Sequence, residues 1–169
     1  MRDILFRGKR VDNGKWVEGY YTELPCGSLG ATIFSNDDEL VCEDTKSYII
    51  KVFTKQHTNY SNSNPLQVIE CEKYEVIPET VGQYTGFRDD QGVRIFEGDI
   101  INVHYDDGTS YLTEVRADGN TLCVDIDDDF DDGNFTLIDF AIDRWREDGC
   151  ELSVISNIYD KDKDADVAI

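Results

Sequence analysis

The chain has 169 residues, with 16 Lys and Arg against 36 Asp and Glu, and a formal net charge of -20. Hydrophobic residues make up 40% of it, which is enough for a packed core and argues against wholesale disorder. The acidity argues against direct binding to nucleic acids or anionic membranes, because those ligands require a surplus of Lys and Arg.

The N-terminal residues do not resemble a secretory signal, because charges interrupt the apolar residues after Phe6. No apolar run approaches the roughly 18 residues that are needed to span a bilayer. We therefore expect a cytoplasmic protein.

Turn-forming sequences recur along the chain and separate runs rich in Val, Ile, Tyr, Phe and Thr. Residues 12–15 separate the runs 4–10 and 16–22, which is typical of a β-hairpin. Strand-length runs at intervals of roughly 8–12 residues favour antiparallel β structure. We predict a mostly β fold, with antiparallel strands in a small SH3-like or related β-barrel or sandwich and at most one or two short helices. The later turn sequences are 89–92, 106–108, 118–120 and 132–134.

Alternation within two of these runs predicts which side chains face the core. In the first run, Ile101, Val103 and Tyr105 share one face, so His104 points away from it. In the second run the core residues are Leu122, Val124 and Ile126, which leaves Cys123, Asp125 and Asp127 on the other face.

Helix signals are weak. Residues 137–146 could form a short helix, because Leu137, Phe140, Ala141 and Trp145 are spaced i, i+3, i+4 and i+8. A strand over residues 135–140 competes with this helix and is slightly favoured.

The chain is expected to divide into an N-terminal β unit over residues 1–80, a C-terminal β-barrel-like unit over 81–159 and a charged tail over 160–169. Residues 56–64, which include His57, are polar and read as a loop of the first unit.

The cysteines are odd in number and widely spaced, which is poor material for a disulfide framework or a standard zinc site. We expect buried, reduced thiols. A zinc site that combines distant cysteines with His57 or His104 is the alternative, and no cofactor is predicted. The five are Cys26, Cys42, Cys71, Cys123 and Cys150.

Three blocks of sequence resemble the YopX-like proteins of bacteriophages and prophages. The first block is residues 1–9 followed by Gly14-Lys15-Trp16-Val17-Glu18-Gly19-Tyr20-Tyr21. The second is residues 76–89, continuing through Phe96-Glu97-Gly98-Asp99-Ile100. The third is Val154-Ile155-Ser156-Asn157-Ile158-Tyr159, with Ser156 where the family usually has Gly.

The resemblance implies a small, mostly β protein in a bacterial host cell, and it supplies no catalytic residue. A structural interpretation of the central block is sufficient. Gly98 would supply a turn and Asp99 would accept hydrogen bonds from nearby backbone N–H groups. Gly82 and Gly86 would serve a bulge or close packing.

The negative charge increases along the chain. Residues 1–100 hold 17 acidic and 11 basic side chains, whereas residues 101–169 hold 19 and 5. The density is highest over residues 125–132, where six of eight positions are Asp, and no Lys or Arg lies between Arg116 and Arg144. This run could be a solvated loop, a calcium or magnesium site, or a surface that binds a basic partner. The spacing does not fit an EF-hand, because Phe130 falls on a ligand position.

The third interpretation has a physical mechanism. Grooves that hold nucleic acid are lined with Lys and Arg, and spaced carboxylates on a β scaffold could occupy them. We therefore expect a non-enzymatic protein that inhibits a basic host enzyme of defence or DNA processing, such as a CRISPR effector, nuclease or restriction enzyme. The central residues would be Asp125, Asp127, Asp128, Asp129, Asp131 and Asp132, with Asp106, Asp107, Asp118 and Asp143 as flanks.

Two other classes of function remain. Catalysis would need paired carboxylates or a nucleophile with a base in a cleft, and no such spacing is visible. A phage accessory protein that acts through assembly or regulatory contacts unrelated to DNA mimicry is the alternative binder. A homo-oligomer is compatible with exposed strand edges.

Overall fold

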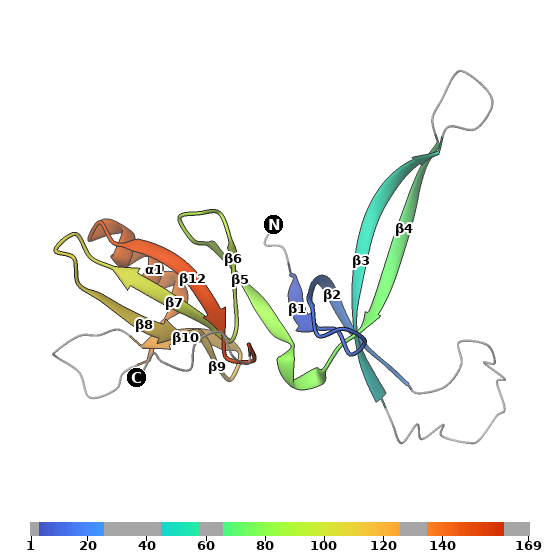
Figure 1. The fold of residues 1–169 in the computed structure, drawn as a ribbon, viewed down its shortest axis with the longest axis horizontal. Coiled ribbons are helices and arrows are strands. Elements are labelled where there is room, and N and C mark those ends of the chain that lie inside the picture. Colours follow the sequence, from blue (N-terminus) through green and yellow to red (C-terminus); the bar gives the residue numbers. More distant parts are fainter. Residues whose placement is uncertain (1–3, 26–44, 58–65, 126–134, 161–169) are drawn as a thin grey trace. The chain divides into compact units, whose positions relative to one another are not determined.

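The computed structural model describes residues 4–25, 45–57, 66–125 and 135–160 (Figure 1). Antiparallel strands dominate these residues, and the helices among them are the 3-10 helix η1 (Pro78–Thr80) and the α-helix α1 (Ile138–Glu147). The prediction of a mostly β fold with one or two short helices is therefore confirmed. No helix in these ranges has the length and hydropathy to cross a membrane.

The chain divides into two compact units, and each is described by itself. The N-terminal unit is Leu5–Val81, and the C-terminal unit comprises Gly82–Ile169 with Met1–Ile4. The tail that was predicted over 160–169 lies, after Asp160, outside the described residues.

The described residues of the N-terminal unit form four strands: β1 (Phe6–Lys9), β2 (Trp16–Pro25), β3 (Thr45–His57) and β4 (Leu66–Glu75). They are ordered β4-β3-β2-β1, and each neighbouring pair is antiparallel. The small core is formed by Val17, Ile49 and Val76, with Phe6, Tyr21 and Tyr74 packed against it.

The predicted hairpin over residues 12–15 is confirmed. β1 pairs with β2 from Phe6↔Gly19 to Lys9↔Trp16, and the Gly14 N–H donates to the Arg10 carbonyl at 2.9 Å. Gly14 has φ +68°, a conformation that side-chain-bearing residues rarely adopt. The loop predicted over 56–64 begins too early, because β3 continues through His57 in pairing with β4.

In the part of the C-terminal unit that the structure describes there are two three-stranded sheets and a hairpin. β7 (Asp99–His104) lies between β12 (Glu151–Asn157) and β8 (Ser110–Glu114). β10 (Thr121–Asp125) lies between β11 (Phe135–Leu137) and β9 (Arg116–Asp118). β5 (Gly82–Arg88) pairs with β6 (Arg94–Phe96) across the predicted turn at 89–92.

The predicted core faces are largely confirmed. Ile101 and Val103 are buried and Tyr105 packs against the same cluster, while His104 is exposed. Val124 is buried as expected and Leu122 packs against the same core, while Ile126 lies outside the described residues. Cys123, on the opposite face of β10, is buried as well. Alternation missed Cys123 because β10 is covered on both of its faces.

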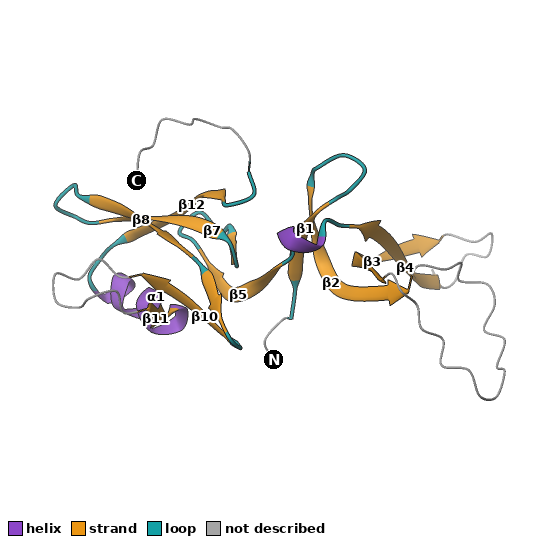
Figure 2. Ribbon diagram, turned by 90° about the horizontal axis from the view of Figure 1, so that it is seen from below, coloured by secondary structure: helices purple, strands orange, loops and turns teal. Residues whose placement is uncertain are grey.

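The segment after residue 134 forms both a strand and a helix, so the preference for a strand over 135–140 is wrong. β11 ends at Leu137, and α1 then packs beside β10 and β11 (Figure 2). The helix buries Ile138, Ala141, Ile142 and Trp145, spaced i, i+3, i+4 and i+7. The predicted face was wrong at Leu137 and Phe140, which are 48% and 63% exposed.

Two blocks of the family resemblance meet around a buried carboxylate. Asp99 is 0% exposed, and its Oδ2 accepts the Phe96 N–H at 2.8 Å while its Oδ1 accepts the Asn157 amide at 3.2 Å. Gly98 has φ +79°, which side-chain-bearing residues rarely adopt, and a Cβ there would make a tight contact of 3.0 Å with Asn157 Nδ2. The predicted roles of Gly98 and Asp99 are confirmed, and the turn before β7 is tied to the end of β12.

The predicted roles of the other two glycines in the central block are also confirmed. A Cβ on Gly82 would lie 2.5 Å from the Glu97 carbonyl oxygen, so close packing requires glycine there. Gly86 has φ +94° and falls within a register shift between β5 and β6, which is the signature of a bulge.

Candidate protein-binding surface

The predicted acidic patch is only partly described by the structure. Asp125 is the last residue of β10. Asp106 and Asp107 lie in the turn between β7 and β8, and both are exposed. The remaining predicted residues, Asp127, Asp128, Asp129, Asp131 and Asp132, lie outside the described residues.

Local hydrogen bonds hold the Asp107 carboxylate in its charged form. Its Oδ1 accepts the Thr109 N–H at 2.8 Å and the Thr109 hydroxyl at 2.6 Å. These bonds, with a smaller contribution from the charge of His104, lower the pKa of Asp107 below its usual value. Asp107 is therefore a fixed negative charge at physiological pH.

Four exposed carboxylates gather at the end of the C-terminal unit that carries this turn. The Asp106 Oδ2 lies beside the turn after α1, where a Cβ on Gly149 would be 3.3 Å from it. Glu151 begins β12 directly opposite His104 of β7. We call this group the acidic end. It consists of Asp106, Asp107, Asp148 and Glu151.

Two of these charges act on the buried Cys150 thiol. Burial raises the pKa of Cys150, and the negative charges of Asp148 and Asp106 raise it further. Burial also raises the pKa of Cys123. Both cysteines are buried free thiols as predicted, whereas Cys71 is exposed, which that prediction did not anticipate. Cys26 and Cys42 lie outside the described residues.

The exposed side of α1 carries three carboxylates spaced four residues apart. Asp139, Asp143 and Glu147 are all exposed, and a separation of four residues advances about 6 Å along a helix. We call these residues the acidic stripe. Phe140 lies next to Asp139, with 63% of its surface exposed. The stripe thus joins regularly spaced charge to an exposed aromatic ring, a combination that is typical of protein interfaces.

Both arginines of α1 make contacts outside the stripe. The Arg144 Nε lies 3.9 Å from Asp148, and an Arg146 guanidinium nitrogen donates to the Arg88 carbonyl at 3.1 Å. Like charges four residues apart destabilise an isolated helix by about 0.2–0.5 kcal/mol per pair. The packing of Trp145 and Ile142 in the core therefore holds the stripe in place against its own repulsion.

Only Asp143 of the stripe was among the predicted flanking residues. Asp139 and Glu147 were missed because a strand was favoured over residues 135–140, and residues four apart share one side only in a helix. The i, i+4 spacing of residues 139, 143 and 147 is the signal that would have identified them. Asp118 is exposed, at the end of β9.

Two further acidic residues serve the fold, the buried Asp89 and the exposed Asp90. Asp89 accepts the Val93 N–H at 2.7 Å and the Gln91 N–H at 3.0 Å through Oδ1, and the Val154 N–H at 3.1 Å through Oδ2. Asp90 accepts the Leu152 N–H at 2.6 Å. On this side of β12, carboxylates thus accept the backbone N–H groups that would otherwise pair with a neighbouring strand.

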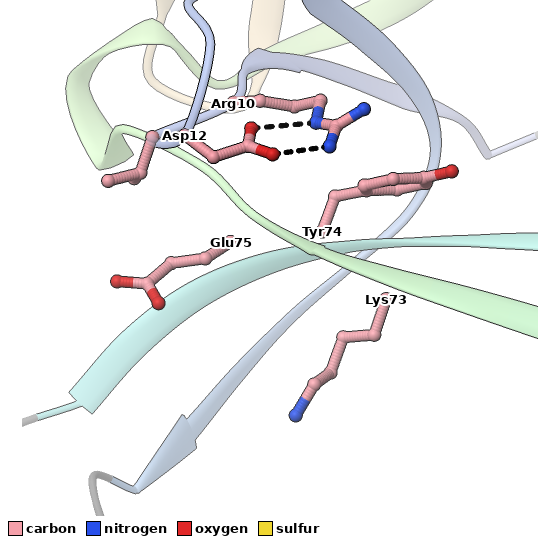
Figure 3. A pocket seen from close by; sticks show the side chains of 6 residues that line it. Arg10, Asp12, Lys73, Tyr74 and Glu75 are labelled. Carbon is pink, nitrogen blue, oxygen red and sulfur yellow. Dashed lines mark hydrogen bonds and ion pairs between the residues drawn. The ribbon is translucent and has the colours of Figure 1, made fainter.

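The N-terminal unit has a pocket of ≈ 380 Å³ beside the first hairpin (Figure 3). Its charges are paired: Arg10 contacts Asp12 at 2.5 and 2.9 Å, and its guanidinium lies 4.3 Å from the centre of the Tyr74 ring. Glu75 contacts Lys46 at 2.9 Å. The carboxylate of Glu72 accepts the Tyr74 hydroxyl and raises the pKa of Tyr74. Each of these side chains therefore has a structural contact, and we assign no binding role to the pocket.

No group of three or more His, Cys, Asp or Glu side chains is arranged to hold a metal ion within the ranges that the structure describes. The acidic run after Asp125 lies outside those ranges, so the calcium and magnesium interpretation remains a prediction.

Comparison with known proteins places the chain in a protein family. A family model described as YopX protein matches residues 32–163, which is most of the chain. Comparison with curated proteins gave no match, and comparison with solved structures gave none either.

Proposed function

Since the chain belongs to the YopX protein family, we propose that it is a phage- or prophage-encoded protein that acts by binding and not by catalysis. Its partner is a basic host protein, and the contact surface is the acidic side of the C-terminal unit. The acidic stripe with exposed Phe140 is the observation that carries this proposal.

The physical case rests on spacing and rigidity. Carboxylates on a packed helix keep their separation, so the entropy that flexible acidic side chains would lose on binding is smaller. Their common sign attracts a basic surface over about 10 Å at 0.1 M salt and raises the association rate. Phe140 can bury apolar surface at the centre of the contact, where binding energy concentrates.

The basic groove of a nucleic-acid enzyme is the partner surface that suits this arrangement best. Such grooves present rows of Arg and Lys to a polyanion. Asp106, Asp107 and the run 125–132 would extend the negative surface beyond the stripe. Inhibition of a host defence or DNA-processing enzyme follows from occupation of that groove.

Capture from a bacterial lysate tests the proposal. The full-length protein, immobilised, is incubated with nuclease-treated lysate, washed at low ionic strength and then eluted with high salt, and the eluate is identified by mass spectrometry. We expect nucleic-acid-binding enzymes to be retained and released by salt, because the contact is electrostatic. If the retained proteins are neither basic nor released by salt, the proposal is wrong.

A further inference from the structure

β3 and β4 extend beyond their pairing with β2 as a two-stranded arm. β2 pairs with β3 only from Thr45 to Ile50. Residues 51–57 of β3 then continue in pairing with residues 66–72 of β4, and Figure 1 shows this part as a ribbon of two strands. We call these two segments the arm. An isolated two-stranded ribbon is marginally stable in water, so a third strand would stabilise the arm.

The outer edge of β4 has backbone groups directed away from β3. The Val76 N–H donates to the Ser47 carbonyl on the β3 side, whereas the Glu75 carbonyl accepts the Val11 N–H on the other side. Because the direction alternates along an antiparallel strand, Cys71 and the other odd-numbered residues of β4 direct their N–H and C=O groups to the same side as Glu75. Among the described residues, β4 is an end strand of its sheet.

One face of β4 would present two carboxylates to a strand added at this edge. Glu70 and Glu72 share the face of Tyr74, because side chains two residues apart in a strand point to the same side. The exposed Glu72 carboxylate accepts the Tyr74 hydroxyl, which restrains its position. Lys51 lies opposite Glu72 on β3, away from the edge. A cation on an added strand would therefore adjoin the carboxylates directly and be separated from Lys51 by two strand spacings, roughly 10 Å.

The other face of β4 leaves room for an apolar side chain. Cys71 is small and exposed, and Val52, which lies opposite it on β3, is 48% exposed. Lys73 shares this face, but its Nζ lies 4.4 Å from the centre of the Tyr48 ring on β3 and is thus directed away from the edge. A small or β-branched residue on an added strand would cover Cys71 and extend the apolar surface of Val52.

The two faces together specify the sequence of the occupant. An antiparallel strand at this edge places alternate residues opposite Glu70 and Glu72 and the residue between them opposite Cys71. We propose that the β4 edge binds an extended segment of a partner protein as an added strand, with Lys or Arg at alternate positions and an apolar residue between them. A second copy of β4 is not this occupant, because it would place Glu70 opposite Glu72, and like charges directly opposite destabilise a strand pair.

This edge belongs to the N-terminal unit, whereas the acidic stripe belongs to the C-terminal unit. The test below uses synthetic peptides and no captured protein. Failure of this proposal therefore does not imply failure of the proposed function, and the reverse holds as well.

Fluorescence anisotropy of labelled peptides with the full chain tests the proposal at about 0.15 M salt. The probe is a peptide of alternating Lys and Val, whose valines direct their N–H groups to β4 when they lie opposite its odd-numbered residues. N-methylation of the valines removes these donors, whereas N-methylation of the lysines removes donors on the far side and is the matched control. We expect saturable binding of the unmodified and lysine-methylated peptides, and binding weaker by about tenfold or more for the valine-methylated peptide, because it loses hydrogen bonds to the edge.

Charge reversal on the chain tests the identity of the occupant. Glu70→Lys combined with Glu72→Lys should weaken binding of the lysine peptide by about tenfold or more and should strengthen binding of a peptide of alternating Glu and Val. Glu23→Lys combined with Glu79→Lys changes the net charge equally at exposed positions outside this edge, and it should alter both affinities much less.

Three results would overturn the proposal. The first is a lysine peptide that shows no saturable binding to the wild-type chain. The second is equal affinity of the two N-methylated peptides, which would show adsorption by charge alone. The third is a peptide of alternating Glu and Val that binds the wild-type chain as tightly as the lysine peptide, because the carboxylates would then not select the occupant. The comparison of methylated peptides leaves the chain unaltered, so it does not depend on the folding of any variant.

Discussion

Replacement of Asp99 by Ala is expected to destabilise the C-terminal unit by roughly 2–4 kcal/mol, because two buried donors lose their acceptor. These donors are the Phe96 N–H and the Asn157 side-chain amide, and neither position gives them access to water. The same change frees the end of β12 from the turn that precedes β7.

Urea denaturation followed by tryptophan fluorescence measures this effect. The chain has two tryptophans, so a Trp16→Phe background leaves Trp145, in the core of the C-terminal unit, as the reporter. Asp107→Ala is the matched control, since Asp107 makes similar local hydrogen bonds but is exposed, and its transition should stay close to that of the background. An Asp99→Ala transition that also coincides with the background would show that the buried carboxylate does not hold the turn.

Neutralisation of the acidic stripe is expected to weaken binding of the captured partner at least tenfold, equivalent to about 1.4 kcal/mol. The triple variant Asp139→Asn, Asp143→Asn, Glu147→Gln removes the regular row of charge. Its helix should be no less stable, because repulsion between residues four apart is removed. Titration calorimetry or surface plasmon resonance against the partner gives the affinity and its dependence on salt.

The control must remove the same charge elsewhere. Glu23→Gln, Glu72→Gln, Glu79→Gln changes three exposed residues of the N-terminal unit and alters the net charge equally. If both triple variants lose affinity to the same extent, net charge alone governs binding and the stripe is not the contact. A third triple, Asp127→Asn, Asp128→Asn, Asp131→Asn, tests the acidic run outside the described residues.

Turn chemistry and alternation predicted most of the fold. Gly14 and Gly98 were identified from local sequence because the conformations they adopt strongly favour glycine. Ile101 and Val103 were identified because one face of β7 packs on the core. These features depend on a few neighbouring residues, which is why a single sequence suffices to predict them.

Features that depend on packing between distant segments were missed. α1 begins at Ile138, directly after a three-residue strand, and no helix-capping side chain marks its start. The contacts of Asp89 and Asp90 with β12 join residues more than 60 positions apart. The acidic end likewise forms only because β7 and β12 pair, which brings Glu151 opposite His104.

Competition between duplex DNA and this protein for the captured partner tests the proposed mimicry most directly. A labelled duplex is bound to the partner, the protein is added, and fluorescence anisotropy follows release of the duplex. We expect full displacement, and none by the stripe variant at the same concentration, because protein and DNA occupy one groove. A ternary complex of partner, duplex and protein would contradict nucleic-acid mimicry.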